Sequence, residues 1–124
     1  MPTPISIVIG GESVPAELND SATACLIAGR LPIEAGFSTW GDEIYFSIPV
    51  KQGAENPKDV VEMGELGYWP PGNAFCIFYG ATPGSTQEHI EPASPVNPIG
   101  RVMGDPKAFK ALAKKSGKIR IEKA

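Results

Sequence analysis

The sequence predicts a mainly β protein whose short strands form a closed β-barrel capped by two short helices. Three observations support this fold class. The 14 glycines and 13 prolines are dispersed along the chain, which is typical of many short strands joined by tight turns. Several segments alternate apolar and polar residues, whereas only two have helical spacing. The most continuously apolar run, residues 74–79, is short and bounded by Gly72 and Gly80, which suits a strand buried on both faces.

Length and composition restrict the class of protein. A chain of 124 residues is expected to form a single domain, residues 1–124, that buries one core without disulfides. A net charge of −3 offers no general attraction for nucleic acid. No segment approaches the ~20 apolar residues that span a bilayer, and the N-terminus has no signal-peptide pattern. We therefore expect no contact with a membrane and a cytoplasmic location.

The first third of the chain predicts a hairpin and a helix. Residues 5–9 and 12–18 alternate around Gly10-Gly11, as in a β-hairpin. Asn19 or Asp20 is then expected to cap a short helix that ends near Gly29 and Pro32. The inner face of this helix is predicted from helical spacing to comprise Leu18, Ala22, Cys25, Leu26 and Gly29. Cys25 and Cys76 are both interpreted as small buried residues without a disulfide.

The middle of the chain contains the clearest half-polar strand, residues 43–50. Strand alternation places Ile44, Phe46 and Ile48 on one face. The opposite face carries Glu43, Tyr45 and Ser47. That second face either lines a pocket or meets solvent. Residues 59–63 are a further short strand candidate.

The last third predicts a loop, a strand, a helix and a final strand. Residues 81–95 form the longest irregular segment, and loops of this length are often functional. Residues 96–103 are expected to form a strand in which Pro98 indicates an edge or a bulge. Asp105-Pro106 is expected to start a helix whose inner residues are Phe109, Leu112 and Ala113. Residues 118–122 alternate as a last strand, which brings the total to eight or nine strands and two helices.

The segment Tyr68-Trp69-Pro70-Pro71 is the sharpest candidate for a binding site. Aromatic residues followed by proline form a stiff turn that loses little entropy when it holds a ligand. Pockets commonly combine an apolar wall with a few polar groups, which Glu43 and Tyr45 could supply. The predicted ligand-binding residues are Thr39, Trp40, Glu43, Tyr45, Tyr68, Trp69 and Pro70. The alternatives are that Trp69 is a core residue and that Glu43 ends a polar hairpin, and the sequence leaves open whether Trp69-Pro70 or Pro70-Pro71 is cis.

Other candidate chemistry is weak. His89 is the only histidine, and with the neighbouring loop carboxylates Glu88 and Glu91 it makes a poor metal site. A Ser-His or Cys-His nucleophile would need the same histidine. The glycine-rich stretches lack a phosphate-binding spacing. No metal, cofactor or catalytic residue is therefore predicted.

Several motifs are similar to those of a known family. Its characteristic runs are matched by residues 39–47, 67–72 and 75–83, together with Glu55-Asn56-Pro57, residues 92–97 and Ile99-Gly100. In these motifs, which cover nearly the whole chain in the same order, the sequence resembles a family of small prokaryotic cyclophilin-like proteins of unknown function.

The resemblance implies an eight-stranded barrel capped by two helices, as in cyclophilins. Cyclophilins isomerise Xaa-Pro bonds with an arginine beside a hydrophobic proline pocket. The Phe-His-Arg run around that arginine has no counterpart here, and Arg30, Arg101 and Arg120 match no catalytic position. Whether the chain is an enzyme is therefore left open by the sequence.

Three functions follow as hypotheses. The first is binding of a small molecule or a proline-containing peptide in a pocket beside Trp40 and Trp69. The second is weak peptidyl-prolyl isomerisation, which needs no nucleophile and for which Arg101 would donate a hydrogen bond. The third is a non-catalytic interaction subunit or homo-oligomer that pairs through edge strands at residues 96–103 or 118–122.

Overall fold

The protein is mainly β, as predicted. Its structure is a computed structural model that describes residues 2–85 and 89–124. The strands are β1 (Thr3–Ile9), β2 (Glu12–Leu18), β3 (Ile33–Gly36), β4 (Ser38–Thr39), β5 (Glu43–Ser47), β6 (Glu65–Trp69), β7 (Ala74–Phe78), β8 (Asn97–Val102) and β9 (Lys118–Lys123). The helices are α1 (Ala22–Ala28), α2 (Ala108–Lys115) and the 3-10 turn η1 (Pro70–Gly72).

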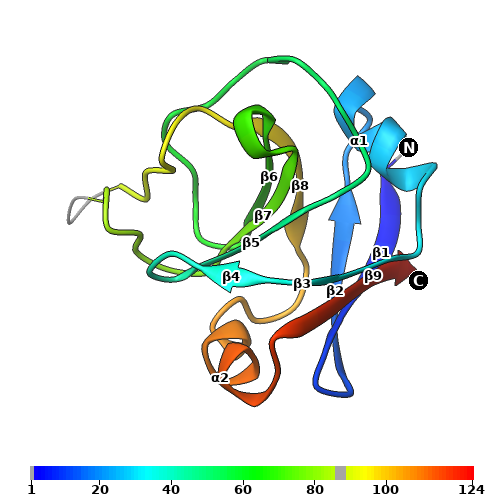
Figure 1. Ribbon diagram of the computed structural model, residues 1–124, viewed down its shortest axis with the longest axis vertical. Coiled ribbons are helices and arrows are strands. Elements are labelled where there is room, and N and C mark those ends of the chain that lie inside the picture. Colours follow the sequence, from blue (N-terminus) through cyan, green and yellow to red (C-terminus); the bar gives the residue numbers. More distant parts are fainter. Residues whose placement is uncertain (1, 86–88) are drawn as a thin grey trace.

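The strands form one nearly closed, barrel-like sheet (Figure 1). Neighbouring strands pair antiparallel in the order β3-β9-β1-β2-β8-β6-β7-β5-β4. The two end strands, β3 and β4, are consecutive in the chain and are separated only by Phe37. One continuous stretch therefore pairs with β9 at one end and with β5 at the other, which brings the two ends of the sheet together.

The strand count among the described residues is nine, not the eight expected from the resemblance. The difference arises at Phe37, whose backbone N–H donates to the carbonyl of Gly117 at 2.9 Å. This bond continues the β3–β9 register by one residue, and Ser38 then pairs with Tyr45 of β5, so the stretch that closes the barrel is divided into β3 and β4 where its partner changes. Counted as one interrupted strand, the stretch gives the eight-stranded ring that the resemblance implies.

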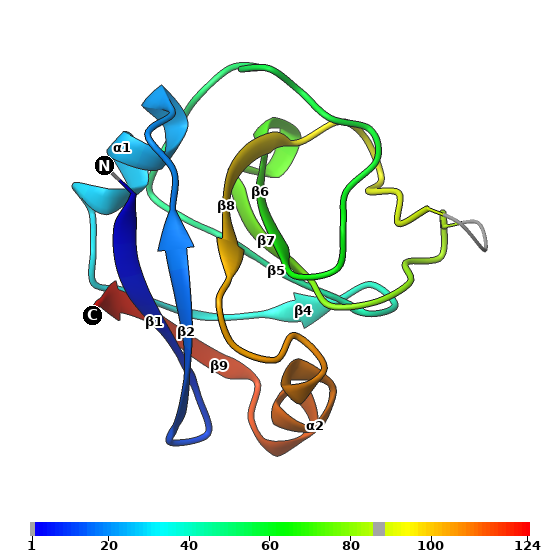
Figure 2. The ribbon, with the colours of Figure 1, turned by 180° about the vertical axis from the view of Figure 1, so that it is seen from behind.

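The two helices lie at opposite ends of the barrel (Figures 1 and 2). In α2, Phe109 and Leu112 are buried and Ala113 packs against the core, as predicted. The helix begins at Ala108, later than expected, because Asp105 first forms a turn. Its carboxylate accepts the N–H of Lys107 at 3.0 Å.

The prediction for α1 was wrong in its cap and in its inner face. Ser21 caps the helix, since its hydroxyl accepts the N–H of Ala24 at 3.1 Å. The side chain of Asn19 does not cap the helix, because its Oδ1 accepts the N–H of Ser21 at 3.0 Å and its amide donates to the carbonyl of Pro98 at 3.0 Å. The buried residues of α1 are Thr23, Ala24 and Ile27. This stripe is as periodic as the predicted one, so spacing alone did not distinguish them. Leu26 and Cys25 are exposed, and both cysteines are free.

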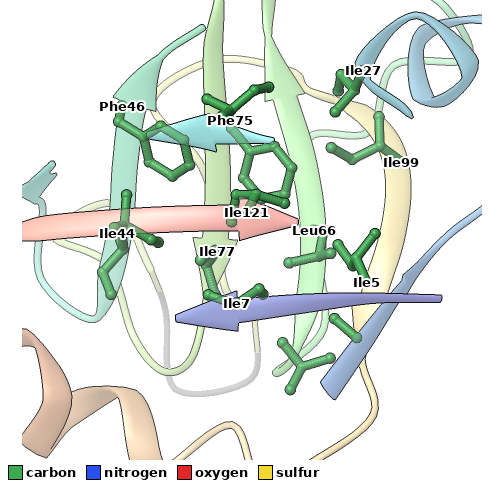
Figure 3. Packing of buried hydrophobic residues seen from close by; sticks show 14 of the residues in the cluster. Ile5, Ile7, Ile27, Ile44, Phe46, Leu66, Phe75, Ile77, Ile99 and Ile121 are labelled. Carbon is green, nitrogen blue, oxygen red and sulfur yellow. The ribbon is translucent and has the colours of Figure 1, made fainter. Parts of the chain in front are cut away.

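The main core fills the barrel interior. Side chains from β1, β5, β6, β7, β8 and β9 point toward one another and meet Ile27 of α1 (Figure 3). Phe46 and Phe75 stack across the β5–β7 pair with ring centroids 5.3 Å apart. The inward residues of β5 are Ile44 and Phe46, as predicted from its alternation. All five residues of β7 are buried, which confirms the strand buried on both faces.

Three expectations about strands need correction or refinement. Residues 59–63 form no strand, and only an isolated bridge joins Val61 to Ile90. Neither segment proposed as an exposed edge is one. β8 is paired with β2 and β6, and β9 is paired with β1 and β3. The bulge indicated by Pro98 is present, because the β6–β8 register shifts between Leu66 and Gly67, the partner of Pro98.

A polar network joins α1 to the long connection between β5 and β6. Glu55 accepts the N–H groups of Ala22 and Thr23 at 3.0 and 2.9 Å, so a distant carboxylate occupies the start of the helix. Asn97, which is fully buried, accepts the N–H of Glu55 at 2.8 Å. Its amide donates to Thr23 Oγ1 at 3.1 Å and to the carbonyl of Gly53 at 2.9 Å. The network therefore satisfies every polar group that it buries.

Replacing Asn97 by alanine is expected to destabilise the protein by about 2 kcal/mol, because three hydrogen-bonding groups lose their partner inside the protein. Chemical denaturation measures this change. The control is Asn19→Ala, which removes two bonds at a half-buried position and is expected to cost about 1 kcal/mol or less. If the two variants lost equal stability, the buried network around Asn97 would not contribute more than the half-buried bonds of Asn19.

Among the described residues, no helix is long and apolar enough to cross a membrane.

Candidate functional site

A second apolar cluster lies on the outer face of β5, β6 and β7. Strand alternation sends Phe75 and Ile77 into the barrel and Ala74, Cys76 and Phe78 outward. The outward side chains are nevertheless buried. Ile90 and Val96 pack against them and belong to the connection from β7 to β8, residues 81–85 and 89–96, which we call the covering loop. Figure 2 shows the path of this connection between the two strands.

Specific hydrogen bonds hold the covering loop in place. Trp69 Nε1 donates to Ser94 Oγ at 2.6 Å, and the N–H of Val61 donates to the carbonyl of Ile90 at 2.9 Å. Within the loop, Ser85 Oγ accepts the N–H groups of Thr82 and Glu91 at 2.9 and 3.1 Å. The Thr82 hydroxyl also donates to the carbonyl of Glu91. The loop is therefore held to β6 at Trp69 and to the β5–β6 connection at Val61, and its own hydrogen bonds brace it internally.

The turn between β4 and β5 is fitted closely to the start of this loop. Asp42 donates its N–H to the carbonyl of Ala81 at 2.8 Å and accepts the N–H of Tyr79 at 3.0 Å. Gly80 leaves room for Asp42, because a Cβ there would lie 2.8 Å from the Asp42 Cβ. Gly41 has φ +63°, a conformation that favours glycine. These contacts place Trp40 and Glu43 beside the covering loop.

A cavity of about 200 Å³ remains between the outer sheet face and the covering loop. We call it the outer cavity. It is lined by Trp40, Glu43, Tyr45, Trp69, Cys76, Pro92, Ala93 and Val96. Both tryptophans of the chain contribute to it. Its wall is therefore mostly aromatic and aliphatic, with one carboxyl group.

Glu43 is the ionisable centre of the outer cavity. It is only 6% exposed. Burial raises the pKa of its carboxyl from 4.5 to about 7, and a hydrogen bond with Cys76 partly opposes this rise. Burial and the neighbouring Glu43 together raise the pKa of the Cys76 thiol well above its usual value. The thiol is therefore protonated at neutral pH and is a poor nucleophile.

The floor of the outer cavity depends on close packing at Gly67. A Cβ at this position would lie 2.8 Å from Val96 Cγ2 and 3.3 Å from the Phe78 ring. Gly67 therefore allows Val96 to lie directly on the sheet and to line the cavity. Only glycine permits this separation between strand and loop.

The structure brings together four of the predicted site residues. Trp40, Glu43, Tyr45 and Trp69 all line the outer cavity. Tyr68 does not, because it points into the barrel, where its hydroxyl donates to the carbonyl of Val50 at 2.6 Å. Alternation along β6 explains the difference, since neighbouring residues face opposite sides.

Thr39 and Pro70 also lie outside the cavity lining. Thr39 is exposed on β4, and Pro70 is half-buried in η1. Among the described residues the cis peptide bond precedes Pro32, so Trp69-Pro70 and Pro70-Pro71 are trans.

The prediction from sequence missed Cys76, Pro92, Ala93 and Val96. Cys76 could have been found, because it is the register partner of Tyr45 on the neighbouring strand and faces the same side. The other three belong to the loop and its end at β8. No local pattern indicates how an irregular segment folds back over a sheet.

The described part of the chain contains no group of three or more His, Cys, Asp or Glu that could hold a metal ion. His89 is exposed and does not line the outer cavity, and Glu88 lies outside the described residues. Arg101 lies on β8 in a different hollow, where its side chain is 67% exposed and is 3.5 Å from Glu17.

The comparisons with known proteins agree with this fold. The family described as cyclophilin-like matches residues 3–122, so the chain belongs to the cyclophilin-like family. A solution structure of a hypothetical protein from Archaeoglobus fulgidus is similar, with 38% sequence identity and a TM-score of 0.81. The similarity covers 99% of this chain and 95% of that one. No curated protein matches the sequence.

Proposed function

We propose that the protein is a binding module that holds a small molecule, or the proline of a peptide, in the outer cavity. The observation that carries this proposal is the convergence of Trp40, Tyr45 and Trp69 around a hollow with a single buried carboxyl. Concave, mostly apolar sites with few polar groups are typical of ligand-binding sites. A volume of about 200 Å³ suits a group of the size of one side chain or a small metabolite.

The fixed walls support binding as well. The Trp69–Ser94 hydrogen bond and the close fit of Asp42 against Gly80 hold two sides of the cavity before a ligand arrives. A preformed site loses less conformational entropy on binding than a flexible one.

Isomerase activity has less support than binding. None of the residues that line the outer cavity is an arginine or a lysine. Arg101, the residue expected to donate to the twisted amide, lies elsewhere on β8 and is paired with Glu17. Binding of an Xaa-Pro peptide therefore remains part of the proposal, and catalysis of its isomerisation does not.

Titration with Xaa-Pro peptides and with a mixture of small metabolites tests the proposal. Both tryptophans line the cavity, so we expect a bound ligand to change the intrinsic fluorescence and the indole and backbone amide shifts of Trp40 and Trp69. Trp40→Ala removes one wall and is expected to weaken binding about tenfold, as for a buried aromatic contact.

Leu26→Ala is the matched control, because Leu26 is an exposed apolar residue of α1 outside the cavity. It should leave the affinity unchanged. If no ligand shifts either tryptophan, or if both variants bind equally well, the proposed function is wrong.

A further inference from the structure

We propose that the outer cavity recognises an alkylated ammonium group, with Trp40, Tyr45 and Trp69 as its aromatic wall and Glu43 as its counter-charge. This inference rests on the proposed function and deepens it by naming the chemical class of the ligand. The ammonium group belongs either to a free small molecule, such as a choline-like compound, or to a methylated lysine side chain of a peptide.

The aromatic lining of the outer cavity favours a cationic ligand. Three of the eight lining residues are tryptophan or tyrosine, whose rings present negative electrostatic potential on their faces. Tryptophan is the strongest of these partners for a cation, and cages of several aromatic residues are used to recognise quaternary ammonium groups. An alkylated ammonium also benefits from the apolar wall, because its methyl groups pack against Pro92, Ala93 and Val96.

The sign of the charge inside the cavity also favours a cation. Glu43 is the only carboxyl among the lining residues, and no lining residue carries a positive charge. Its partner is the thiol of Cys76, which supplies one weak hydrogen bond and no charge. A buried carboxylate without a cationic partner is costly. A bound cation would provide the missing partner.

The other side chains around Glu43 add no positive charge to the outer cavity. The titratable side chains beside it are Tyr45 on its own strand and Cys76 on β7, and neither a phenol nor a thiol can carry a positive charge. From β6 and the covering loop the cavity receives Trp69, Pro92, Ala93 and Val96, which do not titrate. The adjacent Asp42 packs against Gly80, and burial together with the charge of Asp42 raises the pKa of Tyr79.

Cation binding and ionisation of Glu43 are therefore linked. Without a ligand, burial holds the carboxyl pKa at about 7, so a large fraction is protonated at neutral pH. A bound cation favours the ionised form and lowers this pKa. Binding below pH 7 thus releases a proton, and the affinity for a cation rises with pH until Glu43 is ionised.

Isothermal titration with choline and with its uncharged carbon isostere, a dimethylbutanol that has a quaternary carbon in place of nitrogen, tests the inference. We expect choline to bind about tenfold more weakly at pH 6 than at pH 8. Its binding at pH 6 should release protons, which is measured in buffers of different ionisation enthalpy. The isostere should bind weakly, with an affinity that does not depend on pH.

Glu43→Gln keeps the shape of the side chain and removes its charge. We expect this variant to lose about tenfold in affinity for choline and to lose the pH dependence, while binding of the isostere is unchanged. A peptide with trimethyllysine, compared with choline, distinguishes the two sources of the ammonium group, and the unmodified peptide is the control for methylation. Tighter binding of the modified peptide than of choline would identify a protein ligand, and the reverse would identify a small molecule.

The outcomes separate the inference from the proposed function. If neutral ligands shift Trp40 and Trp69 as strongly as cations do, or if Glu43→Gln binds choline normally, the cavity is a binding site but the inference is wrong. If no ligand of either charge shifts the tryptophans, both the inference and the proposed function fail.

Discussion

Replacing Gly100 by alanine is expected to destabilise the protein by about 3 kcal/mol or more, at the upper end of the effects of overpacking. A Cβ at this position would overlap the carbonyl oxygen of Glu17 and would lie 3.0 Å from the Leu18 Cα. Both neighbours are backbone atoms of β2, so no side chain can rotate to relieve the contact. Gly100 pairs with Leu18 in the β2–β8 ladder, where the two halves of the sheet meet.

Thermal and urea unfolding of Gly100→Ala measure this loss. The control is Gly53→Ala, because a Cβ at Gly53 would meet nothing within 4 Å and the backbone there has no left-handed conformation. We expect that control to remain within about 0.5 kcal/mol of the original protein. A Gly100→Ala variant as stable as the control would show that β2 and β8 separate easily, contrary to the structure.

Ionisation of Glu43 is expected to lower the free energy of unfolding by on the order of 3 kcal/mol as the pH rises from below 4.5 to above 7. Burial raises the pKa of this carboxyl from 4.5 to about 7 in the folded protein. Between these values the folded state binds more protons than the unfolded state, so raising the pH favours unfolding. The stabilisation is complete below pH 4.5 and is lost as the pH passes 7. Urea unfolding between pH 4 and pH 8 measures the slope.

Two variants attribute this slope to Glu43. In Glu43→Gln the side chain at position 43 cannot ionise, so the contribution of Glu43 to the pH dependence is absent. The difference in free energy of unfolding between this variant and the original protein should therefore change between pH 4.5 and pH 7. Cys76→Ala removes the hydrogen bond that lowers the Glu43 pKa. The midpoint of the pH dependence should therefore shift to higher pH in that variant. The same difference at every pH in Glu43→Gln would falsify the assignment.

The strands were predicted well because their pattern is local. Alternation in β5 identified Ile44 and Phe46 as core residues and Glu43 and Tyr45 as outward residues. The hairpin of β1 and β2 follows from the two strands around Gly10-Gly11, where both glycines have positive φ. Each of these features depends on residues close together in the chain.

The predictions were wrong where the local sequence is compatible with either of two faces of a helix or a strand pointing inward. The helix α1 has two apolar stripes, and the one that faces inward packs Ala24 and Ile27 into the core while Thr23 bonds to Glu55 and Asn97. Tyr68 and Trp69 are both aromatic residues before a proline. Their register in the barrel decides which side each one faces. Tyr68 points into the barrel, where its hydroxyl is buried, and Trp69 lines the outer cavity.

Local patterns in the sequence predicted the β-rich class, most strands, two helices and four of the residues around the outer cavity. These follow from the spacing of apolar residues and from glycine and proline, which act over a few residues of chain. The closure of the barrel around Phe37 and the position of the covering loop beside Glu43 and Cys76 follow from contacts between distant parts of the chain. The burial that raises the pKa of Glu43 is produced by residues on β7 and in the loop, so no local pattern could indicate it.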